Sequence, residues 1–536
     1  MTADSDALLR AYEQMPYEDL AVAETHVDVL ATAARLAGID AASVGDCRVL
    51  EIGCASGNNL LPMAEALPAS RFVGIDLAPS QVAAGEATIA RLGLENLTLR
   101  AGSIVDLPLE GEGGLGEFDY ILCHGVYSWV PEVVRRRILE ICRRCLAMRG
   151  VAYISYNTYP GWHHKEALRR MMAFHVAPLR AGRPGVDGSP VRQCEQARAL
   201  IEMLAAATHK PDSGWGRSLK ERSEELAQHV PSYIFHDYLE AYNAPCYFSE
   251  FVAELGKERL QYLGAAGGAT ALDDLRPEAR EVLGPLRADR IRLEQYIDFV
   301  TGQTFRRSLI THAGVPLARV ATAAAMKGLL VRALVPPTVA PPDDAALRDP
   351  AYEMEFTGSD ARLVTGNLLY KATLMALHRR RPRPLEFEAL HAATEEILGA
   401  PVDADELAQV IERCWRGRLA SVHSWLDAAL PDASATDRPR ARAAARVQAE
   451  RKMPVANLRH ELVSLDAFDL MMLPLLDGTR DRDALAAAMT ERLDANGVGP
   501  RENGQLIEDP ARVRELVARS VEESLRSLTV SEVLCS

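Results

Sequence analysis

Two acidic residues and two glycines near the start of the chain have the spacing of a nucleoside-binding loop. In RVLEIGCASGNNLLPMAEALPASRFVGIDLAPSQ, a first apolar run carries Glu51, Gly53 and Gly57 follow, and a second apolar run ends in Asp76. Glycines in a strand-to-helix turn let the backbone approach a ligand, and an acid about 20 residues on can accept hydrogen bonds from ribose hydroxyls. Asp76 lies 19 positions after Gly57, so both halves of this pattern are present. As an alternative, Asp76 could cap the helix that follows it.

The glycine pattern differs from that of a dinucleotide site, which requires G-x-G-x-x-G around a pyrophosphate. The loop here reads Gly53-Cys54-Ala55-Ser56-Gly57, and Asn58 stands where a further glycine is common. It resembles the E/D-x-G-x-G-x-G loop of class I S-adenosylmethionine-dependent methyltransferases, with Ala55 in the middle glycine position. Because S-adenosylmethionine carries no phosphate, we expect a small alanine to be tolerated there, and we expect Asn58 to begin the next helix.

This resemblance implies a site for S-adenosylmethionine, with S-adenosylhomocysteine as the product. Gly53 and Gly57 are expected to wrap the methionine moiety, and Asp76 is expected to bind the ribose. Ser103, in AGSIVDLP, stands where such enzymes often carry an acid that faces the adenine amine, so its neighbouring backbone could serve instead. The residues predicted to bind the cofactor are Glu51, Gly53, Ala55, Gly57, Asn58, Asp76, Leu77, Ser103, Ile104 and His124.

Aromatic residues gather where the methyl acceptor is expected, in HGVYSWVP and SYNTYPGW. An amine must be neutral to attack a sulfonium methyl group; an apolar pocket lowers the pKa of an amine, and ring faces attract its ammonium form. The rings could instead pack a lid or a domain interface, His124 could be a structural hydrogen-bonder, and Asn157 could cap a turn. The predicted catalytic residues are Tyr127, Trp129, His124, Asn157 and Tyr159.

Short apolar strands alternate with helices from residue 47 to 156, which predicts an α/β fold whose parallel sheet is covered on both faces. A class I methyltransferase sheet usually has seven strands, so segments 259–266 and 304–312 are predicted to complete it after a helical insertion at 179–257. The first five strands are expected at 48–53, 71–77, 97–103, 118–125 and 150–157.

Longer motifs narrow the resemblance. With the two aromatic stretches, YEQMPYEDLAVAETH, PSYIFHDYLEAYNAPCYFSEFV and EQYIDFVTGQTFRRSLI resemble class I methyltransferases with a methyltransferase regulatory domain, whose best-known members are the rickettsial protein lysine methyltransferases. The resemblance implies methylation of lysine amines on a protein. Two alternatives remain: a methyltransferase of a small molecule or biosynthetic intermediate, and a non-catalytic interaction protein that binds S-adenosylmethionine. His236 and Asp237 are adjacent and cannot pair with each other on one helix face, so we expect their motif to fix the packing of the helical region.

The same resemblance, with a proline-rich stretch at 335–344 that is typical of a linker, predicts the organisation of the chain. We expect a Rossmann-like methyltransferase sheet, a mainly helical regulatory region, and a C-terminal α-rich, partly winged-helix-like module. The predicted bounds are 1–178 for the methyltransferase domain, 179–313 for the regulatory region, 314–344 for a helical connection and linker, and 345–536 for the C-terminal module.

The bulk composition limits the partners. A net charge of −14 provides no diffuse positive field, so we expect no nucleic acid, and a lysine-rich protein substrate is compatible. No apolar run approaches the roughly 20 residues that span a bilayer, and the start lacks a signal-peptide pattern, so a cytoplasmic protein without membrane insertion is expected. Nine scattered cysteines argue against a disulfide framework. Cys142 and Cys145 are interpreted as an apolar helix stripe and not as metal ligands. The C-terminal module could mediate homodimerisation.

Overall fold

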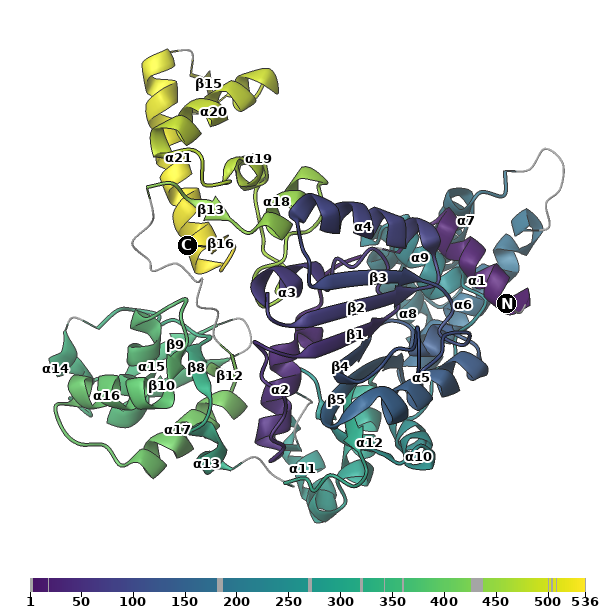
Figure 1. Ribbon diagram of the computed structural model, residues 1–536, viewed down its shortest axis with the longest axis horizontal. Coiled ribbons are helices and arrows are strands. Elements are labelled where there is room, and N and C mark those ends of the chain that lie inside the picture. The colour runs from purple at the N-terminus through teal and green to yellow at the C-terminus, as the bar shows by residue number, and fades with distance from the viewer. Residues whose placement is uncertain are drawn as a thin grey trace.

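The computed structural model describes residues 3–17, 19–180, 187–268, 272–318, 322–341, 343–358, 361–425, 437–499, 501–502, 505–507 and 509–535. Its centre is a seven-stranded sheet in the order β3-β2-β1-β4-β5-β7-β6 (Figure 1), which confirms the predicted α/β class. The strands are β1 (Arg48–Ile52), β2 (Arg71–Asp76), β3 (Leu97–Ala101), β4 (Phe118–Cys123), β5 (Leu146–Asn157), β6 (Leu260–Ala265) and β7 (Phe305–His312).

The last two strands of the sheet come from the segments predicted to complete it. Strands β1 to β5 pair in parallel, whereas β7 runs antiparallel to both β5 and β6. Segments 259–266 and 304–312 contain β6 and β7, so this prediction is confirmed. The strand order reverses at β1, with β2 on one side and β4 on the other. In open α/β sheets, ligands bind at the carboxyl ends of the strands beside such a reversal.

Helices cover both faces of the sheet, which explains why its strands are apolar along most of their length. On one face lie α5 (Glu132–Cys145) and α10 (Phe248–Lys257). On the other lie α2 (Val27–Leu36), α3 (Leu61–Ala66) and α4 (Pro79–Leu92). Cys142 and Cys145 are buried on the inner side of α5, in the apolar stripe that the sequence predicts.

The helical insertion follows β5 directly and has a core of its own, which Met15 of the N-terminal segment joins. It begins at residue 162, earlier than the predicted boundary at 179. Its elements are α6 (Trp162–Arg180), α7 (Pro190–Ala207), α8 (Gly214–Gln228), α9 (Pro231–Ile234) and a π-helical turn (Phe235–Leu239). Two further helices, α11 (Pro277–Leu283) and α12 (Arg290–Thr301), lie between β6 and β7, and α1 (Ala3–Gln14) precedes the sheet.

The segment predicted as a connection and linker, 314–344, is divided. Val315 and Leu317 pack against the core of the methyltransferase part, and the residues from Ala323 onward belong to a compact middle module. It contains α13 (Ala323–Met326) and β8 (Leu330–Ala333), the central strand of a three-stranded sheet with β11 (Leu385–Glu386) and β12 (Ala420–His423). Val335, inside the proline-rich stretch, is buried in the core of this module. The other elements of the module are α14 (Asp344–Leu347), β9 (Met354–Thr357), β10 (Arg362–Thr365), α15 (Leu368–Arg379), α16 (Phe387–Leu398) and α17 (Ala404–Arg416).

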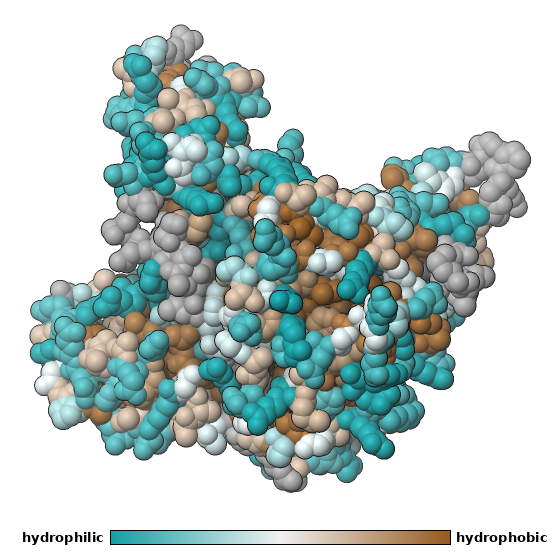
Figure 2. Space-filling view, in the orientation of Figure 1, coloured by the Kyte–Doolittle hydropathy of each residue, from teal (hydrophilic) through white to brown (hydrophobic). Residues whose placement is uncertain are grey.

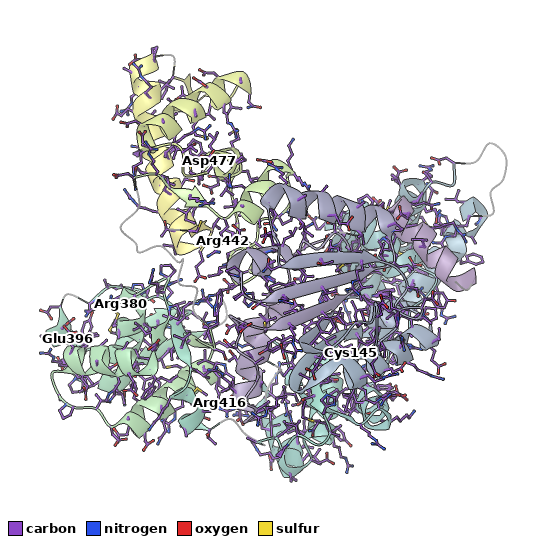
Figure 3. All side chains as sticks on the ribbon, viewed as in Figure 1. Cys145, Arg380, Glu396, Arg416, Arg442 and Asp477 are labelled. Atoms are coloured by element: carbon purple, nitrogen blue, oxygen red, sulfur yellow. The ribbon has the colours of Figure 1, made fainter. Side chains whose placement is uncertain are left out.

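The end of the chain has a hydrophobic core of its own, separate from that of the middle module, and is called the last module below. Residues 345–536 therefore do not form one module. Figure 3 labels Arg380, Glu396 and Arg416 on the middle module, and Arg442 and Asp477 on this last one. The elements of the last module are β13 (Arg440–Ala441), α18 (Ala443–Glu450), α19 (Ala467–Met472), α20 (Arg482–Ala495), β14 (Arg501–Glu502), β15 (Gln505–Leu506), α21 (Pro510–Val530) and β16 (Leu534–Cys535).

Buried charges join both modules to the methyltransferase part. Asp28, on α2, accepts hydrogen bonds from Nδ1 of His423 (2.8 Å) and from the backbone N–H of Ser424 (2.7 Å). Arg459 of the last module forms an ion pair with Glu532 (3.0 Å) and reaches to 4.0 Å from Asp28. Since breaking a buried ion pair leaves an uncompensated charge, this junction stabilises one arrangement of the three parts.

On the face shown in Figure 2, hydrophobic residues gather over the region of β1 to β4, whereas the last module, at the top of the view, is mainly polar. Within the described ranges, no helix is both long and apolar enough to cross a membrane. The same part of the chain contains no group of three or more His, Cys, Asp or Glu residues arranged to hold a metal ion.

Candidate active site

The loop after β1 has a backbone that few side chains adopt. Gly53, Ala55 and Gly57 have φ angles of 77°, 45° and 78°, in the left-handed region that glycine enters freely. A Cβ on Gly53 would lie 2.4 Å from Cγ2 of Val126, so a larger residue there would require Val126 to move. Ala55 is therefore accommodated under strain, which costs about 1–2 kcal/mol.

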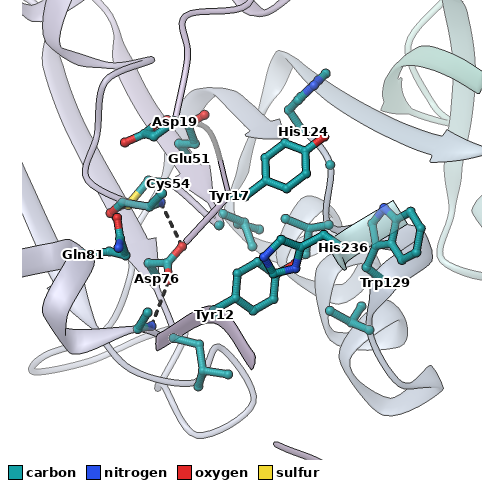
Figure 4. Close-up of a pocket in the computed structure, with 18 of the residues that line it drawn as sticks. Tyr12, Tyr17, Asp19, Glu51, Cys54, Asp76, Gln81, His124, Trp129 and His236 are labelled. Atoms are coloured by element: carbon teal, nitrogen blue, oxygen red, sulfur yellow. Dashed lines mark hydrogen bonds between the residues drawn. The ribbon is translucent and has the colours of Figure 1, made fainter. Parts of the chain in front are cut away.

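Asp76, at the end of β2, holds this loop against the neighbouring turn. Its Oδ2 accepts a hydrogen bond from the backbone N–H of Ala55, and its Oδ1 accepts one from Ala78, both at 2.8 Å (Figure 4). Ala78 is the N-cap residue of α4, so Asp76 itself does not cap that helix. Each carboxylate oxygen has further acceptor capacity, which leaves Asp76 able to bind the hydroxyls of a ribose.

Glu51 presents a polar atom without a partner. Its Oε1 accepts a hydrogen bond from Nδ2 of Asn59 (2.8 Å), and its Oε2 is buried with no hydrogen-bond partner. Burial raises the pKa of Glu51 to about 8. A buried acceptor left unpaired costs about 1–3 kcal/mol, so this oxygen is suited to a ligand ammonium.

Asp19, from the N-terminal segment, is a site residue that the sequence motifs do not reveal. Its Oδ2 accepts hydrogen bonds from the N–H (2.9 Å) and hydroxyl (2.6 Å) of Ser56 and from Nδ2 of Asn58 (3.1 Å). These bonds fix Asn58 in a turn, and α3 begins only at Leu61, so the prediction that Asn58 begins the helix is wrong. Asp19 stands 32 positions before Glu51, inside the N-terminal motif YEQMPYEDLAVAETH, and its place beside the loop is seen only in the fold.

These acids line a cavity of about 510 Å³ at the carboxyl ends of the strands, a size typical of small-ligand sites. Gly57 and Asn58 shape the loop without lining the cavity, and Tyr127 and Tyr159 also lie outside it. The predicted residues that do line it are Glu51, Gly53, Ala55, Asp76, Leu77, Ser103, Ile104, His124, Trp129 and Asn157.

Tyr127 and Tyr159 are occupied elsewhere. Tyr127 is buried in the core under β4, where its ring meets that of Phe251 edge to face at 5.5 Å. Tyr159 stacks on His163, with ring centres 4.0 Å apart. Tyr127 therefore packs in the core of the sheet, which is neither the lid nor the domain interface weighed as alternatives for the aromatic cluster.

His124 and Asn157 reach the cavity from the ends of β4 and β5. The ring Nδ1 of His124 lies 2.8 Å from the hydroxyl of Tyr153, and burial lowers the pKa of His124 to about 4. His124 is therefore neutral at pH 7. Asn157 donates a hydrogen bond from Nδ2 to Oδ1 of Asn243 (3.0 Å), which orients its side chain.

The helical insertion supplies an end of the cavity that sequence reasoning missed. Lys165, on α6, donates a hydrogen bond to the hydroxyl of Tyr233 (3.0 Å) and lies 3.7 Å from Oδ2 of Asp237. Its Nζ is 5.0 Å from the ring centre of Trp162, whose ring meets Trp129 edge to face. Tyr233 and Asp237 lie in the motif PSYIFHDYLEAYNAPCYFSEFV, but the sequence does not show that this motif forms a π-helical turn, a feature frequent at functional sites, beside the cavity.

The N-terminal segment closes the cavity from the side opposite the sheet. The ring of Tyr12 stacks on His236 at 4.6 Å, and Nε2 of His236 donates a hydrogen bond to the carbonyl of Met15 (2.6 Å). Figure 4 shows Tyr12, Tyr17 and His236 beside Asp76 and Trp129. His236 thus links the helical insertion to the segment that carries Asp19.

The polar groups of the cavity fit S-adenosylmethionine. The unpaired oxygen of Glu51, close to Asp19, matches the α-ammonium of the methionine moiety, and Asp76 matches the ribose hydroxyls. Leu77 and Ile104 provide apolar contacts for an adenine ring. The exposed backbone at Gly53 lets the methionine moiety lie against the loop.

Three family models match successive parts of the chain. They are a methyltransferase domain at 50–152, a predicted methyltransferase regulatory domain at 230–312, and the PKMT C-terminal winged-helix domain at 437–532. The last two matches fall on the π-helical region with β6 and β7, and on the last module of the chain.

Two relatives from Rickettsia prowazekii are similar in sequence. The uncharacterised protein RP789 is 30% identical over 94% of this chain and 90% of its own length, and RP028 is 32% identical over 47% and 96%. Among solved structures, PKMT2 from Rickettsia typhi in complex with AdoHcy superposes with a TM-score of 0.83 at 26% identity, over 97% of this chain and all of that one.

Together, the seven-stranded sheet, the cavity and these matches define a class I S-adenosylmethionine-dependent methyltransferase, and S-adenosylmethionine is its cofactor. The chain belongs to the family of these enzymes that carry a methyltransferase regulatory domain.

Proposed function

We propose that this enzyme methylates lysine side-chain amines of a protein substrate. The observation that carries the proposal is an ammonium group, that of Lys165, held at one end of the cofactor cavity by Tyr233, Asp237 and Trp162. That end therefore has the chemistry to receive a lysine amine. The matches to PKMT2 and to the PKMT winged-helix model, both named for protein lysine methyltransferases, support the same substrate class.

The residues of the cavity then have distinct roles. When bound, S-adenosylmethionine supplies an electrophilic methyl group on a sulfonium. Glu51 and Asp19 hold the α-ammonium end, and Asp76 holds the ribose, so the methyl group is kept in a fixed position, and positioning is what an in-line displacement requires. Neutral His124 and Asn157 line the path between the two ends.

At the acceptor end, Asp237 attracts the substrate ammonium and can take up its proton. Burial raises the pKa of Asp237, which makes its carboxylate a better proton acceptor. Trp129 and Trp162 exclude water and favour the neutral amine, since an apolar surrounding disfavours the charged form. A lysine substrate therefore needs no histidine base, in agreement with the low pKa of His124.

The surrounding modules suit a macromolecular substrate more than a metabolite. We infer a methyltransferase domain completed by β6 and β7, a regulatory region that runs from the insertion through these two strands, and two C-terminal modules that present surface beside the enzyme. The net charge of −14 favours basic, lysine-rich segments over nucleic acid. A cytoplasmic location completes the proposal.

Incubation with methyl-labelled S-adenosylmethionine and lysate of the native cell tests the proposal. Label is expected in the protein fraction and, after hydrolysis, in methyl-lysine. Label confined to small molecules would support the metabolite alternative and reject ours. A protein that binds the cofactor and labels neither fraction would support the non-catalytic alternative.

Asp237→Asn tests the acceptor end. The amide keeps the shape of the carboxylate and loses its charge, so kcat/KM for protein substrate should fall while affinity for S-adenosylhomocysteine is unchanged. Glu224→Gln, which neutralises an exposed carboxylate on α8 of the same insertion, is the matched control and should leave kcat/KM unchanged. Equal rates for both variants would contradict the role of Asp237.

A further inference from the structure

Lys165 is one of the few lysines of this chain, and it lies in the cavity that fits the cofactor. The sequence contains seven lysines and 53 arginines, and Lys165 is the only lysine among the described residues that line the cavity. An arginine could make the same ion pair and ring contacts but stays charged in proteins, whereas a lysine amine can lose its proton and act as a nucleophile.

The surroundings of Lys165 form an aromatic cage. Its Nζ lies 5.0 Å from the ring centre of Trp162, 5.7 Å from that of Tyr233 and 5.9 Å from that of Tyr238. Asp237 completes the cage at 3.7 Å. Cages of this composition bind ammonium and methylammonium groups, so this one can hold both the unmodified and the methylated side chain.

We propose that Lys165 is itself a methyl acceptor of this enzyme, and that the chain methylates its own Lys165 in cis. The inference rests on the proposed lysine specificity and extends it to a residue of the enzyme. Lys165 lines the same cavity as Gly53 and Asp76, and its amine is carried on a flexible four-carbon stem.

The reaction balances with the groups present. The ammonium of Lys165 gives a proton to the carboxylate of Asp237, and the neutral amine attacks the methyl carbon of the bound sulfonium. The new N–C bond forms as the C–S bond breaks, and the electron pair of that bond stays on sulfur. The products are a methylammonium on Lys165 and S-adenosylhomocysteine.

Peptide mapping of the purified full-length chain tests the proposal. After incubation with S-adenosylmethionine carrying a deuterated methyl group, the label is expected on Lys165. The labelled fraction should grow at a rate independent of protein concentration, as for a reaction in cis. Lys165→Arg should remove this label, whereas Lys257→Arg, which changes a lysine that is 67% exposed on α10, should not.

Chemical footprinting supplies a readout that does not depend on methyl transfer by the enzyme. Reductive methylation of the native chain with formaldehyde should modify Lys257 equally with and without S-adenosylhomocysteine. Lys165 should be protected when S-adenosylhomocysteine fills the neighbouring part of the cavity. Protection of neither lysine, or of both equally, would overturn the placement of Lys165 beside the cofactor.

Lysate protein in the same labelling reaction separates the two proposals. If lysate proteins gain methyl-lysine while Lys165 stays unlabelled, or if Lys165 is labelled at a rate proportional to protein concentration, methylation in cis is overturned and the proposed function stands. If neither the lysate proteins nor Lys165 gain label, both proposals fall.

Discussion

Binding of S-adenosylhomocysteine should release close to one proton at pH 7, and Glu51 should be its source. Burial raises the pKa of Glu51 to about 8, so its carboxyl group is mostly protonated in the free protein at pH 7. Its unpaired Oε2 gains a cationic partner when the α-ammonium of the ligand binds. The bound state therefore favours the ionised carboxylate, and the proton leaves.

The effect on affinity follows from the difference between the pKa of Glu51 and the pH of the experiment. At pH 7, one unit below a pKa of about 8, ionising Glu51 costs about 1.4 kcal/mol, or about tenfold in affinity. Affinity should rise between pH 7 and 8. It should fall again at higher pH, where the α-ammonium of the ligand loses its own proton and with it the attraction to the Glu51 carboxylate.

Calorimetry in two buffers with different enthalpies of ionisation measures this release. The observed binding enthalpy of the native chain should differ between the buffers in proportion to their ionisation enthalpies, and that of Glu51→Gln should not. Identical enthalpies in both buffers for the native chain at pH 7 would refute the role assigned to Glu51.

Glu51 also affects stability, because its pKa is higher in the folded chain than the ordinary 4.5. The folded chain binds more protons between pH 4.5 and 8, so this group lowers stability as the pH rises through that window. Chemical denaturation at pH 8 should therefore find Glu51→Gln more stable than the native chain, by on the order of 5 kcal/mol at most.

Three further substitutions test the loop and the junction. Asp76→Ala removes the ribose acceptor and should weaken S-adenosylhomocysteine binding about 10- to 150-fold by calorimetry, the equivalent of about 1.5–3 kcal/mol; unchanged affinity in a folded variant would sink the assignment. Ala55→Gly relieves the left-handed strain and should raise the free energy of unfolding by about 0.5–1 kcal/mol after the entropy of glycine is subtracted; a lower melting temperature would argue against it. Asp28→Ala deprives His423 and Ser424 of their acceptor and should cost at least about 3 kcal/mol in denaturant unfolding. The control Asp40→Ala, which removes an 89% exposed carboxylate, should change the free energy of unfolding by no more than about 0.5 kcal/mol. Equal losses for Asp28→Ala and Asp40→Ala would refute the stabilising role of the junction.

The side of the cavity formed by the ends of β1 and β2 could be predicted because its residues follow one another along the chain. Glu51, Gly53 and Asp76 lie at the ends of adjacent strands, so their spacing in sequence reports their spacing in space. The strain at Ala55 was not predictable, since no residue type reveals its own φ angle. The sheet edge was predictable because β6 and β7 keep the apolar pattern of strands.

The end of the cavity around Lys165, where we propose that the acceptor binds, could not be predicted, because the fold assembles it from distant segments. Lys165 and Asp237 are 72 positions apart. The sequence predicts only a packing role for the motif of Asp237, and the fold of the insertion brings both side chains to the cavity. Asp19 lies in the motif YEQMPYEDLAVAETH, but that motif does not show that Asp19 folds back onto the loop after β1. The prediction of a linker from the proline-rich stretch at 335–344 failed for a related reason. Prolines also occur in segments beside a strand, and here Val335 is buried in the core of the middle module.

The most direct test of the account is residue-level mass spectrometry of proteins from the native cell after reaction with deuterated S-adenosylmethionine and the purified enzyme. The account predicts labelled methyl groups on the side-chain nitrogen of lysines, and their loss when the enzyme carries Asp76→Ala. Labelled methyl groups on other side chains, or turnover of a metabolite with no labelled protein, would contradict it.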